Sequence, residues 1–264
     1  MITGASLGIG RSIAHKLAER GFNIILVALP TDELAQTELE LKNKFGINTE
    51  SIGIDLSQDG APQIVFEKVE KLGIRLSILI NNAGIGYVGR FEDNPFSYYR
   101  TLIKLNAQAT VQMTYLFLPM LKERSRAYIL NMGSLASILP APFKSVYVAS
   151  KQFIRGFSLS LCEELREDGI SVTTVCPNTV LTKEIHEKRV AALGWLGRIS
   201  ALRPNQVAEE SLEAMFAGKR CIVPGMLNRF ASFLLRLLPY NIMISLIQNQ
   251  IKKTMLPLKP ISTP

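Results

Sequence analysis

Two short strings, far apart in the chain, contain residue types suited to dinucleotide binding and proton transfer. The first reads Thr3-Gly4-Ala5-Ser6-Leu7-Gly8-Ile9-Gly10, and the second reads Tyr147-Val148-Ala149-Ser150-Lys151. Glycines spaced Gly-x-x-x-Gly-x-Gly allow a tight turn that a ligand can approach closely, and the free N–H groups of a following helix favour phosphate. The same spacing also fits a strand-to-helix turn without a ligand, so the first string alone leaves both interpretations open.

Tyr147 and Lys151 lie one turn apart on the same face if the second string is helical. A free phenol has a pKa of about 10, and a nearby ammonium stabilises the phenolate and lowers that pKa. Such pairs also occur on solvated helix faces. Ser134 favours the functional interpretation, because it follows the apolar run 128–132, where a buried strand is expected to end. Open α/β sheets bind ligands at those ends.

Five motifs in order make the chain resemble the short-chain dehydrogenases/reductases over nearly its whole length. The glycine string is similar to their cofactor loop, Asp55 to their adenine contact, and residues 81–84 to the motif that closes their fourth strand. Residues 177–182 resemble the segment that holds the nicotinamide carboxamide. The resemblance implies cofactor contacts at Gly4, Ser6, Gly8, Ile9, Gly10, Asp55, Asn82, Ala83, Gly84, Tyr147, Lys151, Pro177, Val180 and Thr182.

The resemblance also implies a reaction, the NAD(P)(H)-dependent interconversion of a ketone and a secondary alcohol. Asn106, Ser134, Tyr147 and Lys151 match the family's catalytic residues. Tyr147 is expected to act as general acid or base, while Lys151 lowers its pKa and holds the nicotinamide ribose. Ser134 is expected to hydrogen-bond the carbonyl oxygen, and Asn106 to support a water that relays protons to Lys151.

Two other functional classes stay open. The chain could be a cofactor-binding regulator without turnover, although the complete Ser134, Tyr147 and Lys151 set argues against this. It could also be a dehydratase or epimerase that acts on a sugar nucleotide, but such members of the family carry a larger C-terminal substrate region.

The elements that must position these residues alternate along the chain. Apolar strand patterns cover residues 23–28, 51–54, 76–80, 127–132, 171–176 and 221–223, and helical patterns cover 9–20, 32–45, 61–72, 95–122, 146–167 and 205–217. The strands lack polar alternation, so both of their faces should be covered. This order predicts a single α/β domain with a doubly wound parallel, Rossmann-like sheet. Only Met1 and Ile2 precede Thr3, so the first strand is expected to be truncated.

Two departures from the family pattern bear on the cofactor. Leu29 follows the second strand where the family usually has an aspartate for NAD or a basic residue for NADP. Because no carboxylate is present there to repel a 2′-phosphate, NADP(H) is favoured over NAD(H). The usual Pro-Gly is Pro177-Asn178 here, and asparagine is the residue other than glycine that best tolerates positive φ.

The last part of the chain differs from the rest in charge. The net charge is +8, yet no acidic residue follows Glu213, and the seven basic residues beyond it are Lys219, Arg220, Arg229, Arg236, Lys252, Lys253 and Lys259. We therefore divide the chain into a Rossmann domain, residues 1–225, and a basic apolar tail, residues 226–264. The tail is interrupted by Arg236 and Pro239, which argues against a spanning helix. It is expected to lie on a membrane surface, to cover the substrate pocket or to form a subunit contact.

The remaining expectations concern partners. The tail is too apolar to bind nucleic acid. Three cysteines without metal spacing and two distant histidines predict no metal site. Long apolar helices 95–122 and 146–167 predict a homodimer or homotetramer, as in the family. The pocket lid is expected within residues 183–203, with Ile185, Val190, Leu193, Trp195, Leu196 and Ile199 as its apolar members. With the tail, it favours a hydrophobic small-molecule substrate, such as a lipid or steroid-like ketone, in a cytoplasmic or peripheral membrane protein. The same residues could instead pack the lid down without touching the substrate.

Overall fold

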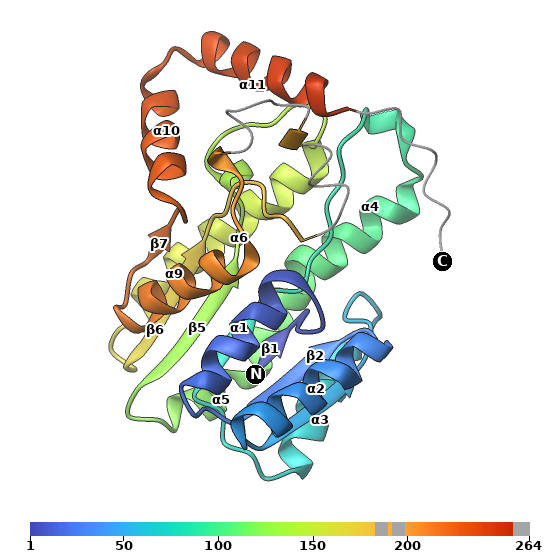
Figure 1. The fold of residues 1–264 in the computed structure, drawn as a ribbon, viewed down its shortest axis with the longest axis vertical. Helices are drawn as coiled ribbons and strands as arrows, with labels where there is room; N and C mark the ends of the chain where they lie inside the picture. Colours follow the sequence, from blue (N-terminus) through green and yellow to red (C-terminus); the bar gives the residue numbers. More distant parts are fainter. Residues whose placement is uncertain (183–189, 192–198, 256–264) are drawn as a thin grey trace.

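One sheet of seven parallel strands organises the described part of the chain. The computed structural model describes residues 1–182, 190–191 and 199–255. Within them the strand order is β3-β2-β1-β4-β5-β6-β7 (Figure 1). The strands are β1 (Ile2–Thr3), β2 (Ile24–Ala28), β3 (Thr49–Gly53), β4 (Ile78–Asn81), β5 (Ala127–Met132), β6 (Ile170–Val175) and β7 (Cys221–Ile222). This confirms the predicted doubly wound α/β fold.

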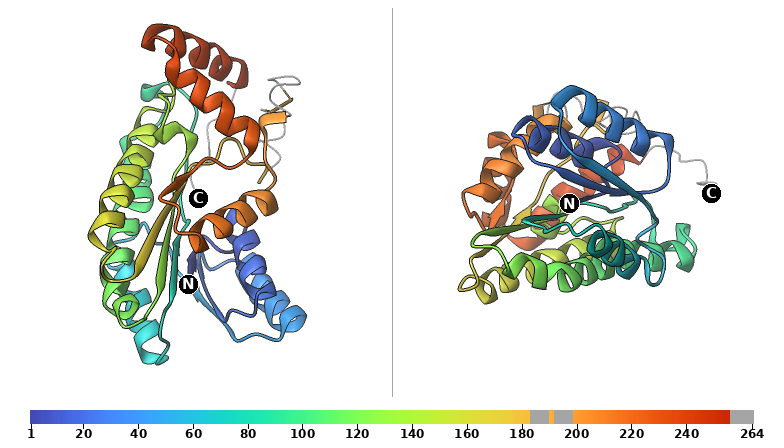
Figure 2. Two further views of the ribbon diagram at one scale, coloured as in Figure 1. Left: turned by 90° about the vertical axis from the view of Figure 1, so that its left-hand side faces the viewer. Right: turned by 90° about the horizontal axis from the view of Figure 1, so that it is seen from below.

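Helices cover both faces of the sheet, as its apolar strands require. On one face lie α1 (Gly8–Glu19), α2 (Asp32–Phe45) and α9 (Pro204–Phe216), and on the other lie α3 (Ala61–Lys71), α5 (Ala109–Lys122) and α6 (Ser145–Glu164) (Figure 2). Side chains alternate between these two layers along each strand. Leu26 packs in the first core, whereas its neighbours Ile25 and Val27 pack in the second.

The predicted first strand is short and central. β1 pairs with β2 through Ile2 and Leu26, and with β4 through Ile2 and Ile80. Both residues of β1 are buried, and Ile2 has no exposed surface. The two-residue strand therefore still joins the two halves of the sheet.

The predicted helix over residues 95–122 is interrupted. Instead of one regular helix, the structure has α4 (Phe96–Ile103), a π-helical turn η2 (Lys104–Gln108) and then α5. A π-turn inserts an extra residue into a helix and is frequent at functional sites. Asn106 lies within this turn and is 1% exposed. The single-helix prediction was wrong here because the residue pattern on either side of the turn is helical.

The apolar tail forms two helices beyond the sheet. α10 (Met226–Leu237) and α11 (Tyr240–Thr254) lie at one end of the molecule, on the side of the carboxyl ends of the strands (Figures 1 and 2). They separate at Pro239, because Leu238 before it adopts an extended conformation, which proline favours in its predecessor. None of the helices in the described residues is long and apolar enough to span a bilayer.

Candidate active site

The strand order reverses between β1 and β4, which creates a crevice at their carboxyl ends. Gly4 follows β1 there, and Asn82 follows β4. The Asn82 side-chain nitrogen donates to the carbonyl oxygens of Thr3 at 3.0 Å and of Gly4 at 3.1 Å. In return, the Thr3 hydroxyl accepts from the backbone N–H groups of Asn82 at 2.9 Å and Ala83 at 3.0 Å. These bonds fix the glycine loop against the end of β4.

The glycine loop has the shape that its spacing predicts. Gly4 and Gly8 have positive φ values of 63° and 58°, and a Cβ on Gly10 would lie 2.1 Å from the Gly4 carbonyl oxygen. α1 begins at Gly8 without a side-chain cap and without an acidic residue in its first turn. Its first N–H groups therefore face the crevice as donors to which a phosphate can bind.

Ser134 lies beside the crevice at the end of β5. Its backbone is extended, and its hydroxyl accepts a hydrogen bond of 3.2 Å from the Ala136 N–H at the start of η3 (Leu135–Ser137). Leu135 N–H donates to the Pro177 carbonyl oxygen at 2.9 Å, so the β5 and β6 ends are held together. The same strand-end position that the sequence predicted for Ser134 thus brings it toward the 177–182 segment.

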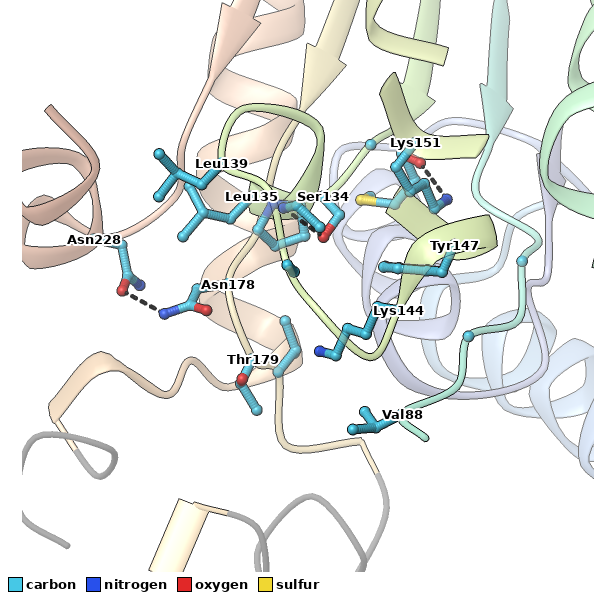
Figure 3. A pocket seen from close by; sticks show the side chains of 18 of the residues that line it. Val88, Ser134, Leu135, Leu139, Lys144, Tyr147, Lys151, Asn178, Thr179 and Asn228 are labelled. Carbon is cyan, nitrogen blue, oxygen red and sulfur yellow. Dashed lines mark hydrogen bonds between the residues drawn. The ribbon is translucent and has the colours of Figure 1, made fainter. Parts of the chain in front are cut away.

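Tyr147 and Lys151 lie one turn apart on α6, as predicted (Figure 3). The Lys151 ammonium lies 6.0 Å from the centroid of the Tyr147 ring and donates to the Met132 carbonyl oxygen at 2.8 Å. A Cβ on Gly86 would lie 3.0 Å from the Tyr147 ring. The absence of a side chain at Gly86 therefore leaves room for this phenol.

Burial controls the protonation of both groups. It lowers the pKa of Lys151 from 10.5 to about 8. It also raises the pKa of Tyr147, although a hydrogen bond with Ser134 acts in the opposite direction. The pKa of Tyr147 is therefore raised where the sequence predicted a lowered one, because burial removes the phenolate from water.

Asn106 is placed behind Lys151 by the π-turn. Its side-chain nitrogen donates to the Ile85 carbonyl oxygen at 2.8 Å and to the Ser150 hydroxyl at 3.2 Å, and its oxygen accepts from Ile85 N–H at 2.9 Å. A Cβ on Gly84 would lie 3.0 Å from the Asn106 oxygen and 3.4 Å from the Lys151 ammonium. The 81–84 motif and Asn106 therefore form one packed support for Lys151.

A cavity of about 700 Å³ joins most of the predicted residues. It is lined by Gly4, Gly8, Ile9, Asn82, Ala83, Gly84, Ser134, Tyr147, Lys151, Pro177, Val180 and Thr182. Ser6, Gly10, Asp55 and Asn106 are not among its lining residues. Asp55 follows β3, and hydrogen bonds from Ser57 and Gln58 lower its pKa even though burial acts to raise it.

The predicted lid is described only in part. Val190 is buried and lines the cavity, whereas Ile199 is 47% exposed. Ile185, Leu193, Trp195 and Leu196 lie outside the described residues. Asn178 does not use a positive φ, since the described residue other than glycine with that conformation is Phe143. Its side chain instead binds Asn228 of α10.

Sequence reasoning missed some residues of the cavity wall. Lys144 lines it three residues before Tyr147, and that spacing could have indicated a shared helix face (Figure 3). Ser232 and Leu235 of α10 and Ile247 and Ile251 of α11 also line it. No local pattern relates these residues to Tyr147. The cysteines are free thiols, and the described residues contain no group of three or more potential metal ligands.

Known proteins share both the sequence and the fold. Residues 1–192 match the family described as short chain dehydrogenase. The very-long-chain 3-oxoacyl-CoA reductase of Homo sapiens is 35% identical over 189 residues, which are 69% of this chain and 59% of that enzyme. The Kluyveromyces lactis enzyme of the same name is 33% identical over 88% of this chain and 66% of its own length. The matches thus span less than two thirds of these relatives.

Solved structures give the same result. A 7beta-hydroxysteroid dehydrogenase superposes with a TM-score of 0.84 at 23% identity, covering 93% of this chain and 95% of its own, and shows the shared fold. A short-chain dehydrogenase from Sphingobium yanoikuyae, solved in complex with NADPH, is 26% identical with a TM-score of 0.75 and covers 90% and 95% of the two chains. From the matched residues, the sheet order and these relatives, the chain belongs to the short-chain dehydrogenase/reductase family.

Proposed function

We propose that this protein is an NADP(H)-dependent oxidoreductase that interconverts a hydrophobic ketone and its secondary alcohol. The observation that carries the proposal is that Ser134, Tyr147 and Lys151 line the same cavity as the glycine loop. The Tyr147 hydroxyl gives its proton to the carbonyl oxygen during reduction and takes it back during oxidation. Ser134 hydrogen-bonds that oxygen as negative charge develops on it.

Lys151 and Asn106 support the proton transfer. Because the pKa of Lys151 is lowered to about 8, this group can exchange protons with solvent near neutral pH. Asn106 acts as a positioning residue, since its side chain binds Ile85 and Ser150 and does not line the cavity. In this function a water near Asn106 relays protons to Lys151.

The glycine loop and the strand ends fit a nicotinamide dinucleotide. A Cβ at Gly4, Gly8 or Gly10 would lie within 3 Å of a neighbouring atom, so the shape of this loop requires glycine at these positions. We assign the phosphates to the loop from Gly4 to Gly10 with Ser6, the adenine to Asp55, and the nicotinamide half to Tyr147, Lys151, Pro177, Val180 and Thr182, beside Asn82, Ala83 and Gly84. When bound, the cofactor supplies the reducing equivalent.

The preference for NADP(H) is supported by Leu29. It follows β2 and is 54% exposed, so no carboxylate opposes a 2′-phosphate at this position. Arg11, in the first turn of α1, forms a salt bridge of 2.5 Å with the Glu40 carboxylate, so the preference does not rest on this cation. The Sphingobium yanoikuyae relative was solved with NADPH, which favours the same choice.

Apolar wall residues and the relatives' names together support a lipid-like substrate. Leu139, Val190, Leu235, Ile247 and Ile251 line the cavity. The relatives from Homo sapiens and Kluyveromyces lactis are named for a 3-oxoacyl group on a very long chain. A ketone on a long apolar chain would present its carbonyl to Ser134 and Tyr147 and its chain to these apolar residues.

We further propose a division of labour within the chain. Residues 1–225 form the catalytic domain, and residues 226–264 form a tail that closes the cavity and contacts a membrane surface. Exposed Tyr115 on α5 and Phe153 on α6 lie on the helices that pair subunits in the family, which supports a homodimer or homotetramer.

Substitution of Tyr147 by phenylalanine tests the proposed activity. We expect NADPH-dependent reduction of a ketone panel to fall by about 10²–10⁴-fold, because the proton donor is lost and the ring is kept. Tyr115→Phe, which removes a hydroxyl from a tyrosine that is 77% exposed, is the matched control and should retain its rate. Cofactor binding, followed by NADPH fluorescence, should survive in both variants. Near-native turnover by Tyr147→Phe would exclude Tyr147 as the acid.

A further inference from the structure

α10 turns its apolar face toward solvent. Asn228 and Ser232, one turn apart, are 3% and 6% exposed, whereas Phe230, Phe233 and Leu237 are 63%, 59% and 67% exposed. A helix on a protein surface normally buries its apolar stripe and exposes its polar one. On this helix two polar side chains are buried while the large aromatic and aliphatic ones are exposed, so its outer face needs an apolar partner.

Polar contacts hold α10 in this orientation. The Asn228 side-chain oxygen accepts from Asn178 at 3.0 Å, and its nitrogen donates to the Ser200 carbonyl oxygen at 2.9 Å (Figure 3). Ser232 and Leu235, one and two turns further, line the cavity. The inner face of α10 is therefore a wall of the active site, and rotation of the helix would break these bonds.

α11 extends the same two-sided arrangement. Met243 is buried, and Ile247 and Ile251, each one turn further along, line the cavity. Ile242 and Leu246 are 51% and 47% exposed. The outer face of the two helices consists of the exposed apolar residues Met226, Leu227, Phe230, Phe233, Leu234, Leu237, Leu238, Tyr240, Ile242 and Leu246.

Charge distinguishes the partners that could cover this outer face. The cations Arg236, Lys252 and Lys253 lie on the same helices, and no acidic residue follows Glu213. A second copy of the chain would bring like charges together. An anionic lipid surface offers both an apolar layer and opposite charge, and each basic residue near it contributes about 1 kcal/mol.

We propose that the outer face of α10 and α11 docks on an anionic bilayer, and that the substrate passes from this bilayer into the cavity lined by their inner faces. Docking places the apolar wall residues next to the lipid acyl region, so a long-chain ketone need not cross water. The assignment of a ketone rests on the proposed function, whereas the docking itself does not.

Vesicle binding tests the docking step without turnover. The full chain is sedimented with vesicles of phosphatidylcholine alone or with one fifth phosphatidylglycerol. We expect binding to the anionic vesicles that weakens as salt rises. Lys252→Gln with Lys253→Gln should weaken it about 30-fold, and Phe230→Ser with Phe233→Ser at least about tenfold.

The control pair is Leu39→Ser with Ile64→Ser, which removes two exposed aliphatic side chains away from the tail. Leu39 on α2 is 60% exposed, and Ile64 on α3 is 45% exposed. This pair should bind vesicles like the parent protein. Equal vesicle binding by the parent protein and all variants would overturn the docking proposal. So would variants that lose self-association while the parent protein does not bind vesicles.

Kinetics then test delivery from the bilayer. For Phe230→Ser with Phe233→Ser, kcat/KM on a long-chain ketone embedded in anionic vesicles should fall at least about tenfold more than on a short water-soluble ketone. Equal losses on the two substrates would overturn delivery. Vesicle binding without turnover of any ketone would support docking and refute the proposed function instead.

Discussion

Replacing Lys151 by methionine is expected to stabilise the fold and to disable the active site. Lys151 is 5% exposed, and burial lowers its pKa from 10.5 to about 8. At about 1.4 kcal/mol per pKa unit, this difference corresponds to about 3 kcal/mol by which the buried ammonium opposes folding. Methionine removes this cost but leaves the Met132 carbonyl oxygen without its donor, at a cost of about 1–3 kcal/mol.

The net gain of up to about 2 kcal/mol should raise Tm at pH 7 by up to about 8 °C. Its pH dependence identifies the cause. Below pH 8 the lysine is protonated in both the folded and the unfolded chain, so the full cost is present. Between pH 8 and 10.5 the unfolded chain keeps a proton that the folded protein has lost, so the stability contribution of Lys151 improves as pH rises.

Calorimetry of Lys151→Met and the parent protein at pH 7 and pH 10 measures this difference. The advantage of the variant should shrink at pH 10, while its ketone reduction falls at least about 100-fold at both pH values. Lys68→Met, which changes an exposed lysine of α3, is the control and should show neither effect. A variant with a lower Tm than the parent protein at pH 7 would refute the reasoning that burial of the ammonium destabilises the fold.

Two further predictions concern the cofactor and the assembly. Leu29→Asp should weaken NADP(H) binding about 5–150-fold relative to NAD(H), because a carboxylate near the 2′-phosphate costs about 1–3 kcal/mol. Titration of both cofactors measures this, with Leu39→Asp as control. A parent protein that prefers NAD(H) would contradict the assignment. Tyr115→Ser with Phe153→Ser should convert a homodimer or homotetramer into smaller species in light scattering with detergent present, since both side chains are exposed on the proposed pairing helices; a monomeric parent protein at micromolar concentration would exclude this interface.

Local sequence determined the fold class and the elements that carry the site residues. Glycine spacing predicted the turn before α1, and helix α2 begins and ends where its pattern predicted, at Asp32 and Phe45. Apolar runs predicted the strands within one or two residues. These features depend on neighbours in sequence, such as the freedom of Gly4 and Gly8 to adopt positive φ or the missing alternation in β2.

Long-range contacts decided the features that the sequence did not reveal. The π-turn is accompanied by hydrogen bonds between Asn106 and Ile85, 21 residues apart. The pKa of Tyr147 is raised chiefly by burial, which the spacing of Tyr147 and Lys151 in the sequence does not reveal.

The orientation of α10 is of the same kind. The sequence indicated a basic, apolar tail but not the direction in which its apolar residues face. That direction follows from the bond between Asn228 and Asn178, 50 residues earlier in the chain. The sequence by itself thus determined which elements form and which residues could do the chemistry, because both depend on local residue types and spacing. Only the tertiary structure decided how deeply those residues are buried and which face of the tail meets solvent, because both depend on partners distant in sequence.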